Sequence, residues 1–288
     1  MEPLDRLKGF LELILTPSLP VFAAGALVVL LVPVLLHFYL YRATANAGLP
    51  SVLLLGPSGA GKTALLTLFE RSASTSTRTS QTPAQVELAV SEDGTSGFRD
   101  DLDAAGGAAK KFLLVDTPGY GKLRGTAEAR LARATKLRAV VFVVDGGALA
   151  EPEGVAAAAS YLYDVLLFLQ KRAGSGRGSK APPAVPVLIA ANKADLFTAL
   201  PAALVRSSLE AELARIRTSR SRGLLDSGVG ADDVDAAQGD GWLGEYGAEK
   251  FSFAQMLEFD VEVDIAAGNV TGDGPGADKW WSWIADKI

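Results

Sequence analysis

The sequence predicts an α/β fold: a mostly parallel six-stranded sheet with helices on both faces, preceded by one N-terminal transmembrane helix. Short continuous apolar runs recur along the chain, as strands buried on both faces of a parallel sheet require. Polar motifs follow these runs directly, which places the motifs together at one edge of the sheet. The continuous runs are Val52–Leu55, Phe112–Val115, Val140–Val144 and Val185–Ala190, and Val261–Ile265 alternates as a further strand.

Composition excludes several classes of function. The chain has 288 residues, 28 Lys and Arg, 33 Asp and Glu, and a formal net charge of −5. This acidic balance argues against nucleic-acid binding through bulk charge. The chain has no cysteine and one histidine. It therefore forms no disulfide, no thiolate zinc site and no histidine-rich metal site. The single histidine, His37, lies in an uncharged segment, which is a poor position for the catalytic base of a serine hydrolase.

That uncharged segment runs from Leu13 to Tyr41 and predicts a membrane anchor. Residues 1–18 are expected to form a short N-terminal segment and 19–42 a transmembrane helix, because about 20 apolar helical residues span a bilayer. Two alternatives remain. The A-x-A patterns in Ala43–Ala47 suit a cleaved signal peptide, although the apolar run is long for one and the preceding segment is not basic. The other alternative is a buried soluble helix.

A phosphate-binding loop follows the first predicted strand. The segment Gly56–Thr63 matches G-x-x-x-x-G-K-[ST], and good helix formers follow it. Glycines let the backbone N–H groups wrap an anion, and the start of the helix adds its positive dipole. Lys62 is expected to bridge the terminal phosphates, and the Thr63 hydroxyl to bind Mg²⁺. The expected phosphate-site residues are Gly56, Pro57, Ser58, Gly59, Ala60, Gly61, Lys62, Thr63 and Ala64.

Two later motifs indicate the nucleotide. Asp116 and Gly119 belong to a D-x-x-G segment, in which Asp116 reaches Mg²⁺ and the Gly119 N–H reaches the third phosphate. Asn192-Lys193-Ala194-Asp195 is an N-K-x-D pattern. The Asp195 carboxylate accepts hydrogen bonds from the ring N1–H and the exocyclic amine of guanine, while Lys193 packs along the base. Adenine lacks that donor pair and would leave the carboxylate unpartnered, so the pattern favours GTP over ATP.

The order of these three motifs resembles the Ras-like small GTPase superfamily. Five segments and the anchor resemble, more narrowly, the family of signal recognition particle receptor β subunits. The resemblance runs from the anchor to the C-terminus and is weakest across 91–110 and 221–249. The segments are Thr77–Thr82, which looks like that family's first switch, Val140–Asp145, the Asn192–Asp195 loop, Leu213–Arg220 and Phe251–Met256.

The resemblance implies a single-pass protein of the endoplasmic reticulum membrane that binds GTP and Mg²⁺. Residues 19–42 would lie in the lipid bilayer and the GTPase domain, 48–288, in the cytosol. The expected partner is the receptor's α subunit, held by the GTP-bound switches, with no direct nucleic-acid contact. An acidic, glycine-rich stretch at about 223–248 is expected to be a mobile insertion in the domain.

The switches depart from the common pattern. Thr82 is the first choice for the threonine that meets Mg²⁺ and the third phosphate, and Thr79 is the runner-up. Tyr120 stands where Ras-like enzymes usually carry the glutamine that orients the attacking water, so no catalytic residue is assigned. A phenol does not reproduce an amide's paired donor and acceptor, which predicts slow intrinsic hydrolysis. Arg124 in the second switch is expected to be a solvated side chain or a contact to a phosphate or partner.

The guanine site also departs at its last loop. Ala266 is taken to stand where the family has serine and Gly268 where it has lysine. The Ala267 backbone N–H can still reach guanine O6, since that contact needs no side chain.

Two helices are expected near the C-terminus. Pro201–Arg217 would turn Leu204, Leu209, Leu213 and Ile216 inward. In the last helix Trp280 and Trp283 would pack in the core, with Trp281 more exposed or near the membrane.

Three other functions fit parts of the pattern. An Arf- or Sar-like trafficking GTPase would cycle rapidly, but the chain begins Met1-Glu2-Pro3 and lacks the second-position glycine that myristoylation needs. A scaffold that keeps its GTP without turnover is not separated from a slow switch by sequence. An ATP-dependent kinase is disfavoured by Asp195.

Overall fold

The computed structural model describes residues 26–35, 48–91, 109–134, 136–174, 184–226, 242–244, 250–272 and 276–288. The chain divides into two compact units, Met1–Gly48 and Leu49–Ile288. In the first unit, residues 26–35 form a helix with exposed side chains. Within the described residues, no helix has the length and apolar character to cross a membrane. Most of the predicted span 19–42 lies outside the described residues, so this span stays a prediction.

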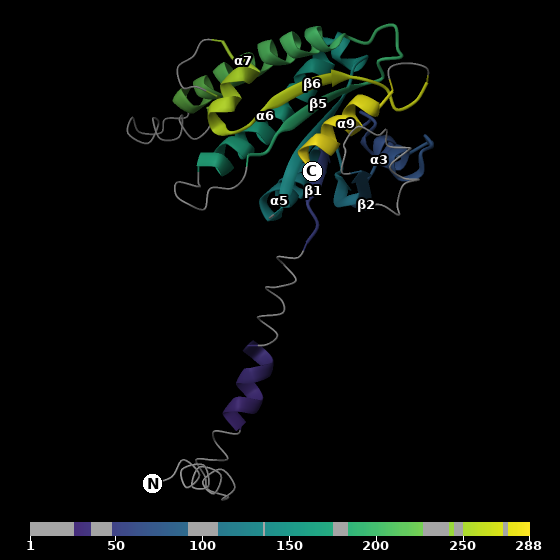
Figure 1. The fold of residues 1–288 in the computed structure, drawn as a ribbon. Coiled ribbons are helices and arrows are strands. Elements are labelled where there is room, and N and C mark those ends of the chain that lie inside the picture. The colour runs from purple at the N-terminus through teal and green to yellow at the C-terminus, as the bar shows by residue number, and fades with distance from the viewer. Residues whose placement is uncertain are drawn as a thin grey trace, which may run out of the picture. The chain divides into compact units, whose positions relative to one another are not determined.

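The second unit is built on a sheet with helices packed against it (Figure 1). The sheet has six strands in the order β2-β3-β1-β4-β5-β6. All neighbouring strands are parallel except β2 and β3, which are antiparallel. This confirms the predicted sheet. The five strands that the sequence predicts correspond to β1 and β3–β6, and the sequence does not locate β2. The strands are β1 Ser51–Leu55, β2 Ala84–Ser91, β3 Ala109–Asp116, β4 Leu137–Asp145, β5 Val187–Asn192 and β6 Val263–Ala267.

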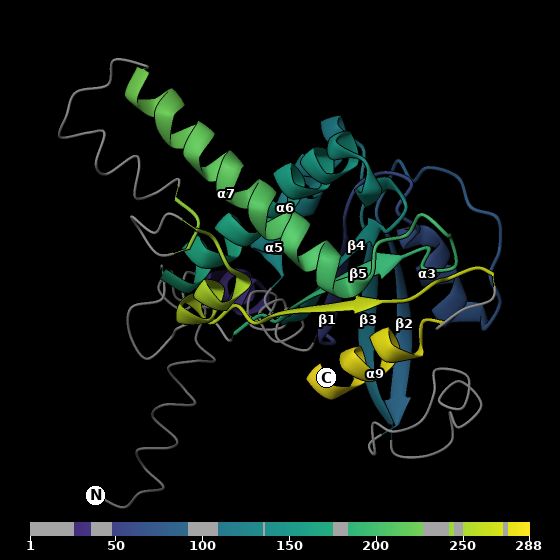
Figure 2. The ribbon, with the colours of Figure 1, turned by 90° about the horizontal axis from the view of Figure 1, so that it is seen from above.

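Helices cover both faces of the sheet (Figure 2). Leu53 and Leu55 of β1 face one core, into which α5, α6 and α7 pack, whereas Val52 and Leu54 face a second core under α3 and α9. Both faces of the strand are thus buried, which explains its continuous apolar run. The helices are α3 Lys62–Arg71, α5 Arg124–Arg133, α6 Pro152–Gly174, α7 Ala202–Asp226 and α9 Asp278–Lys287, with short 3₁₀ turns η1 Gly121–Leu123, η2 Ala148–Ala150 and η3 Phe253–Phe259.

The buried stripe of α7 differs from the prediction. Leu209 and Leu213 are buried as expected, but Leu204 is 51% exposed and its neighbour Val205 is fully buried. The stripe therefore continues the four-residue spacing back to Val205, and the prediction for Leu204 is wrong. The helix also continues to residue 226, so the first residues of the expected 223–248 insertion are helical. Most of the rest of that insertion lies outside the described residues.

The same stripe continues into Arg217, which is 2% exposed. Its guanidinium lies 4.6 Å from the Trp242 ring centroid and donates to the Leu243 carbonyl at 3.2 Å. Gln170 of α6 secures the same segment through the Trp242 carbonyl and the Gly244 N–H. This basic side chain thus joins segment 242–244 to the helix layer through a cation–π contact and a hydrogen bond.

The tryptophans of α9 also differ from the prediction. Trp281 is fully buried, with ring centroids 5.0 Å from Phe69 and 6.0 Å from Phe112. Trp283 is only partly buried and donates its indole N–H to Asp264 at 2.8 Å. The expected order of exposure is therefore reversed. The reason is that α9 presents its 280, 281 and 284 positions to the core between α3 and β3.

We expect Trp281→Ala to lower the free energy of unfolding by about 3–5 kcal/mol, because it leaves a large cavity between fully buried rings. Trp283→Ala serves as the matched control and should cost clearly less, since that ring already contacts solvent. Urea unfolding followed by circular dichroism measures both. An equal or larger loss for Trp283→Ala would show that burial does not decide the difference.

Candidate nucleotide site

The loop between β1 and α3 requires glycine at two of its positions. Gly56 has φ 132° and Gly61 has φ 100°, both in the left-handed region. A Cβ on Gly56 would lie 2.1 Å from the Val143 carbonyl oxygen, and one on Gly61 would lie 2.1 Å from Asn192 Nδ2. The loop therefore packs its backbone directly against β4 and the end of β5. The loop leads into the N-terminus of α3, where backbone N–H groups favour a bound anion.

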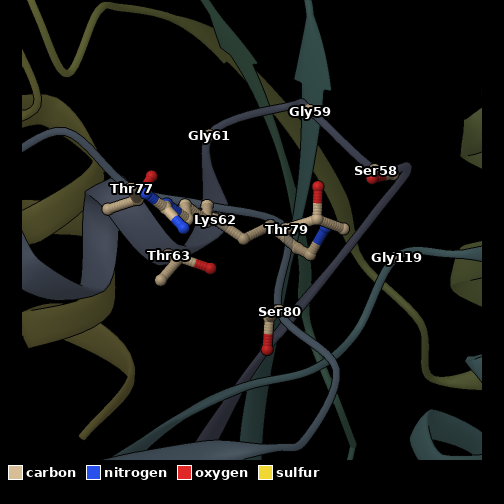
Figure 3. A pocket seen from close by; sticks show the side chains of 10 residues that line it. Ser58, Gly59, Gly61, Lys62, Thr63, Thr77, Thr79, Ser80 and Gly119 are labelled. Atoms are coloured by element: carbon tan, nitrogen blue, oxygen red, sulfur yellow. The ribbon is translucent and has the colours of Figure 1, made fainter.

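A pocket of about 200 Å³ lies over this loop. It is smaller than the roughly 300–1,000 Å³ of pockets that hold a whole small molecule, which suits the phosphate part of a nucleotide. Figure 3 shows Thr77, Thr79 and Ser80 on a segment beside Ser58, Gly59 and Gly61 of the loop. Gly56, Pro57, Ala60 and Ala64, which were also expected in the phosphate site, are not in the lining. The lining residues are Ser58, Gly59, Gly61, Lys62, Thr63, Thr77, Arg78, Thr79, Ser80 and Gly119.

Lys62 places a cation inside the loop. It is 6% exposed, and its Nζ donates to the carbonyls of Gly56 at 2.8 Å and Pro57 at 2.7 Å. Burial lowers the pKa of Lys62 to about 8, although the nearby Asp116 acts in the opposite direction. Two backbone oxygens thus hold the ammonium at the phosphate site, and a bound polyanion would strongly favour its charged form.

Thr63 and Asp116, the two residues expected to bind a cation, are in direct contact. The Thr63 hydroxyl donates to Asp116 Oδ2 at 2.6 Å, and Asp116 is fully buried. Burial raises the pKa of Asp116. The other carboxylate oxygen, Oδ1, is buried without a hydrogen-bond partner among the described residues. A buried oxygen without a partner is costly, and hydroxyl and carboxylate oxygens are the ligands that Mg²⁺ prefers. These residues therefore fit a magnesium ion.

Gly119 closes the phosphate pocket from β3. A Cβ at this position would lie 2.5 Å from both the Gly56 carbonyl oxygen and Lys62 Nζ. Only glycine allows the backbone this close to the loop. The next residue, Tyr120, is 52% exposed and precedes η1. The phenol that replaces the usual glutamine is therefore not packed into the protein.

The first-switch segment brings Thr79 rather than Thr82 to the pocket. Thr79 is in the lining, whereas Thr82 is exposed and outside it, with its carbonyl accepting from the Ser80 hydroxyl at 2.7 Å. In this structure the runner-up is the better placed threonine. Arg78 also lines the pocket and was missed. The signal for it was a single cation within a run of Ser and Thr that the sequence already placed near phosphate.

Asn192 joins three loops at the end of β5. Its Nδ2 donates to the Ala60 carbonyl at 2.8 Å, and its Oδ1 accepts from the N–H groups of Lys193 at 2.8 Å and Val270 at 3.1 Å. The side chain is 3% exposed. It therefore couples the phosphate loop, the N-K-x-D loop and the loop after β6. Sequence identified this residue as part of the base site, but not its contact with the phosphate loop.

The remaining residues of the guanine pattern lie around this amide. Lys193 has φ 64°, and its Nζ pairs with Asp145 Oδ2 at 2.5 Å, while Asp145 Oδ1 accepts from two backbone N–H groups. Asp195 is exposed, and its Oδ2 lies against the backbone of Gly272. Ala267 is the last residue of β6, opposite Ala191. The pattern residues are thus brought to one sheet edge, and the roles of Asp195 and Ala267 toward a base stay predictions.

The fold and this site define the class. One antiparallel edge strand on a parallel sheet, a glycine-rich phosphate loop and the D-x-x-G and N-K-x-D segments at the strand ends make a small-GTPase-like α/β protein. A family model described as "Signal recognition particle receptor beta subunit" matches residues 47–257. The chain belongs to this family, as its sequence resemblance indicated.

Curated relatives carry the same name. The chain is 30% identical to the signal recognition particle receptor subunit beta of Mus musculus over 277 residues, which cover 93% of this chain and 88% of the relative. It is 27% identical to the subunit beta of Saccharomyces cerevisiae over 240 residues, covering 83% and 84%.

Solved structures agree with this assignment. The SRb-GTP/SRX complex of the signal recognition particle receptor from Chaetomium thermophilum has TM-score 0.71 and 47% identity, covering 83% of this chain and 100% of that one. The structure of the mammalian SRP receptor has TM-score 0.59 and 26% identity, with the same coverage.

We expect Gly119→Ala to weaken nucleotide binding by about 10- to 100-fold, because the added methyl group overpacks the contact with Gly56 and Lys62. Gly121→Ala is the matched control, since a Cβ there meets nothing within 4 Å. Isothermal titration with GDP and a GTP analogue measures both variants. Equal affinities for the two variants would contradict the close approach at Gly119.

The pKa of Lys62 predicts proton uptake on binding. When the pH lies above the Lys62 pKa of about 8, this lysine is largely neutral in the free protein, and a bound polyphosphate restores its proton. At pH 8.5 binding should take up roughly three quarters of a proton, and affinity should fall as pH rises further. Calorimetry in buffers of different ionisation enthalpy measures the uptake. No uptake at pH 8.5, relative to pH 6.5, would contradict the lowered pKa.

Proposed function

We propose that the chain is the membrane-anchored GTP-binding subunit of a signal recognition particle receptor, which tethers the α subunit at the endoplasmic reticulum in co-translational targeting. The observation that carries this proposal is the clamp of Asn192, which couples the phosphate loop to the guanine loop. Family membership supports the receptor assignment, and the related complex titled SRb-GTP/SRX supports both the nucleotide and the partner.

Each residue of the site has a distinct task toward GTP. The loop N–H groups and Lys62 bind the phosphates, and Asp195 selects guanine through its paired acceptors. Thr63 and Asp116 are the residues that would hold Mg²⁺, which when bound neutralises charge on the phosphate oxygens. Two observations support this role: Asp116 Oδ1 has no hydrogen-bond partner among the described residues, and a relative was solved as SRb-GDP-Mg.

The third phosphate would be sensed from two sides. Thr79, with Arg78 beside it, reaches the pocket from the first switch, and Gly119 reaches it from the end of β3. A third phosphate gives both segments a common partner, so it orders them together, and its loss releases them. The ordered segments would form the surface that recruits the α subunit. Thr82 remains the alternative ligand if the first switch rearranges on binding.

Hydrolysis is proposed to be slow without a partner. The half-exposed Tyr120 offers no amide to orient water, and no other side chain is assigned to that task. The GTP-bound state would therefore persist and act as a holding state for the α subunit. The anchor would be residues 19–42, with the nucleotide domain in the cytosol, where GTP is available. The uncharged segment from Leu13 to Tyr41 supports this arrangement.

The test is the nucleotide that co-purifies with the complete chain and its turnover over hours. We expect retained GTP with little hydrolysis, and Tyr120→Gln should raise turnover by at least about tenfold by supplying an amide to the attacking water. Tyr120→Phe is the control and should leave turnover low. Rapid conversion to GDP by the unaltered chain would favour a trafficking GTPase, and bound ATP would overturn the guanine assignment.

The same assay separates a switch from a scaffold. The α subunit's domain is added to the GTP-loaded chain. For a switch, we expect this domain either to change the turnover of GTP or to dissociate from the chain when GDP replaces GTP. Binding that is equal in both nucleotide states, with no turnover, would instead support a permanent scaffold.

A further inference from the structure

The edge of the sheet opposite the nucleotide site carries a group of unpaired cations. Four of them lie between residues 130 and 138, at the end of α5 and the start of β4, and all four are exposed. None has an ion-pair partner among the described residues. This group, called the basic corner below, consists of Arg130, Arg133, Lys136 and Arg138.

The basic corner lies where the chain enters the domain. The Ser51 N–H, at the start of β1, donates to the Lys136 carbonyl at 2.9 Å, and Ser51 pairs with Leu137 of β4. The end of α6 lies at the same corner, because the Arg172 guanidinium donates to the carbonyls of Leu131 and Ala134. A concentration of positive charge at this one place is notable in a chain whose net charge is −5.

Acidic groups are distributed differently along this edge. Glu128 is the acidic residue on α5 itself, one turn before its end, and it is exposed. Among the described residues, the other exposed acidic groups of this edge lie toward β6, at the far side of the sheet from β1. They are Glu258, Asp260, Glu262 and Asp286. The described part of this edge is therefore polarised, with its basic side at the chain entrance.

We infer that the basic corner is a docking surface for anionic lipid headgroups. The inference rests on the proposed anchor, because a helix ending at residue 42 leaves a tether of at most roughly 25 Å before residue 49. Such a tether keeps this edge near the bilayer, where each exposed Lys or Arg gains attraction from an anionic leaflet. The acidic side would tilt away, so the domain would rest on the basic corner with the nucleotide edge facing the cytosol.

The test uses residues 49–288, which form a compact unit with their own two-sided core. The related Chaetomium thermophilum chain, solved in its complex, spans a comparable part of this chain. Vesicles of phosphatidylcholine with 30% phosphatidylserine, on the order of physiological anionic content, are compared with pure phosphatidylcholine by flotation at 0.15 M salt. We expect binding only to the anionic vesicles, and its loss at 0.5 M salt because of screening.

The deciding variant is Arg133→Gln with Lys136→Gln and Arg138→Gln. Its partition onto anionic vesicles should fall about 100-fold, because each of the three cations contributes a factor of roughly five. A control matched in charge removes three exposed cations elsewhere, of which Arg215 is paired with Glu212: Lys122→Gln, Arg215→Gln and Lys279→Gln. It loses the same net charge and should bind nearly as the unaltered domain does. Equal loss in the two variants would mean that net charge, and not the corner, drives binding, and would overturn the inference.

Two further measurements separate lipid binding from RNA binding and from the anchor. If the domain prefers a 20-nucleotide RNA to anionic vesicles at the same salt, and the corner variant loses that preference, the surface is a nucleic-acid site and the lipid inference fails. The anchor itself is tested separately by alkaline extraction of the complete chain from phosphatidylcholine vesicles. If alkali extracts the chain from the vesicles, the proposed anchor is wrong. The flotation result for residues 49–288 is independent of that outcome.

Discussion

The site depends on one buried amide. Asn192 holds the phosphate loop through Ala60, its own loop through Lys193 and the last loop through Val270. A buried amide is stable only when its donor and acceptor are satisfied, so the three loops must meet in this one arrangement. The loops expected to bind the phosphates and the base are therefore coupled, and a displacement of one loop would strain the Asn192 hydrogen bonds to the others.

Electrostatics at the same edge suit a polyanion with a divalent cation. Burial shifts the pKa of Lys62 down and that of Asp116 up, so both charged forms are disfavoured in the isolated protein. A triphosphate restores the charge of the lysine, and a magnesium ion that of the carboxylate. The protein thus pays a standing electrostatic penalty that its ligands relieve together, which favours binding of the two as a unit.

The two edges of the sheet divide the work. The carboxyl ends of the strands carry the nucleotide chemistry, as a parallel sheet with its helices dictates. The opposite edge receives the chain from the N-terminal unit and carries the basic corner. In the proposed arrangement this polarity turns the switches toward a cytosolic partner, since the edge that meets the membrane is the one farthest from them.

The sequence by itself determined five of the six strands, the phosphate loop and the guanine pattern, because these depend on local runs and fixed spacings. Each buried strand reads as a continuous apolar run, and the loop needs glycine wherever its backbone takes a positive φ. Only the tertiary structure decided that Thr79 and Arg78, rather than Thr82, line the pocket, and that Trp281 and Arg217 are buried. Those outcomes depend on how a helix or loop is rotated against distant segments, such as α9 against Phe69 or α7 against Trp242. Periodicity within one element gives its buried stripe to within about one residue, and packing against the neighbours selects which side chain fills the space.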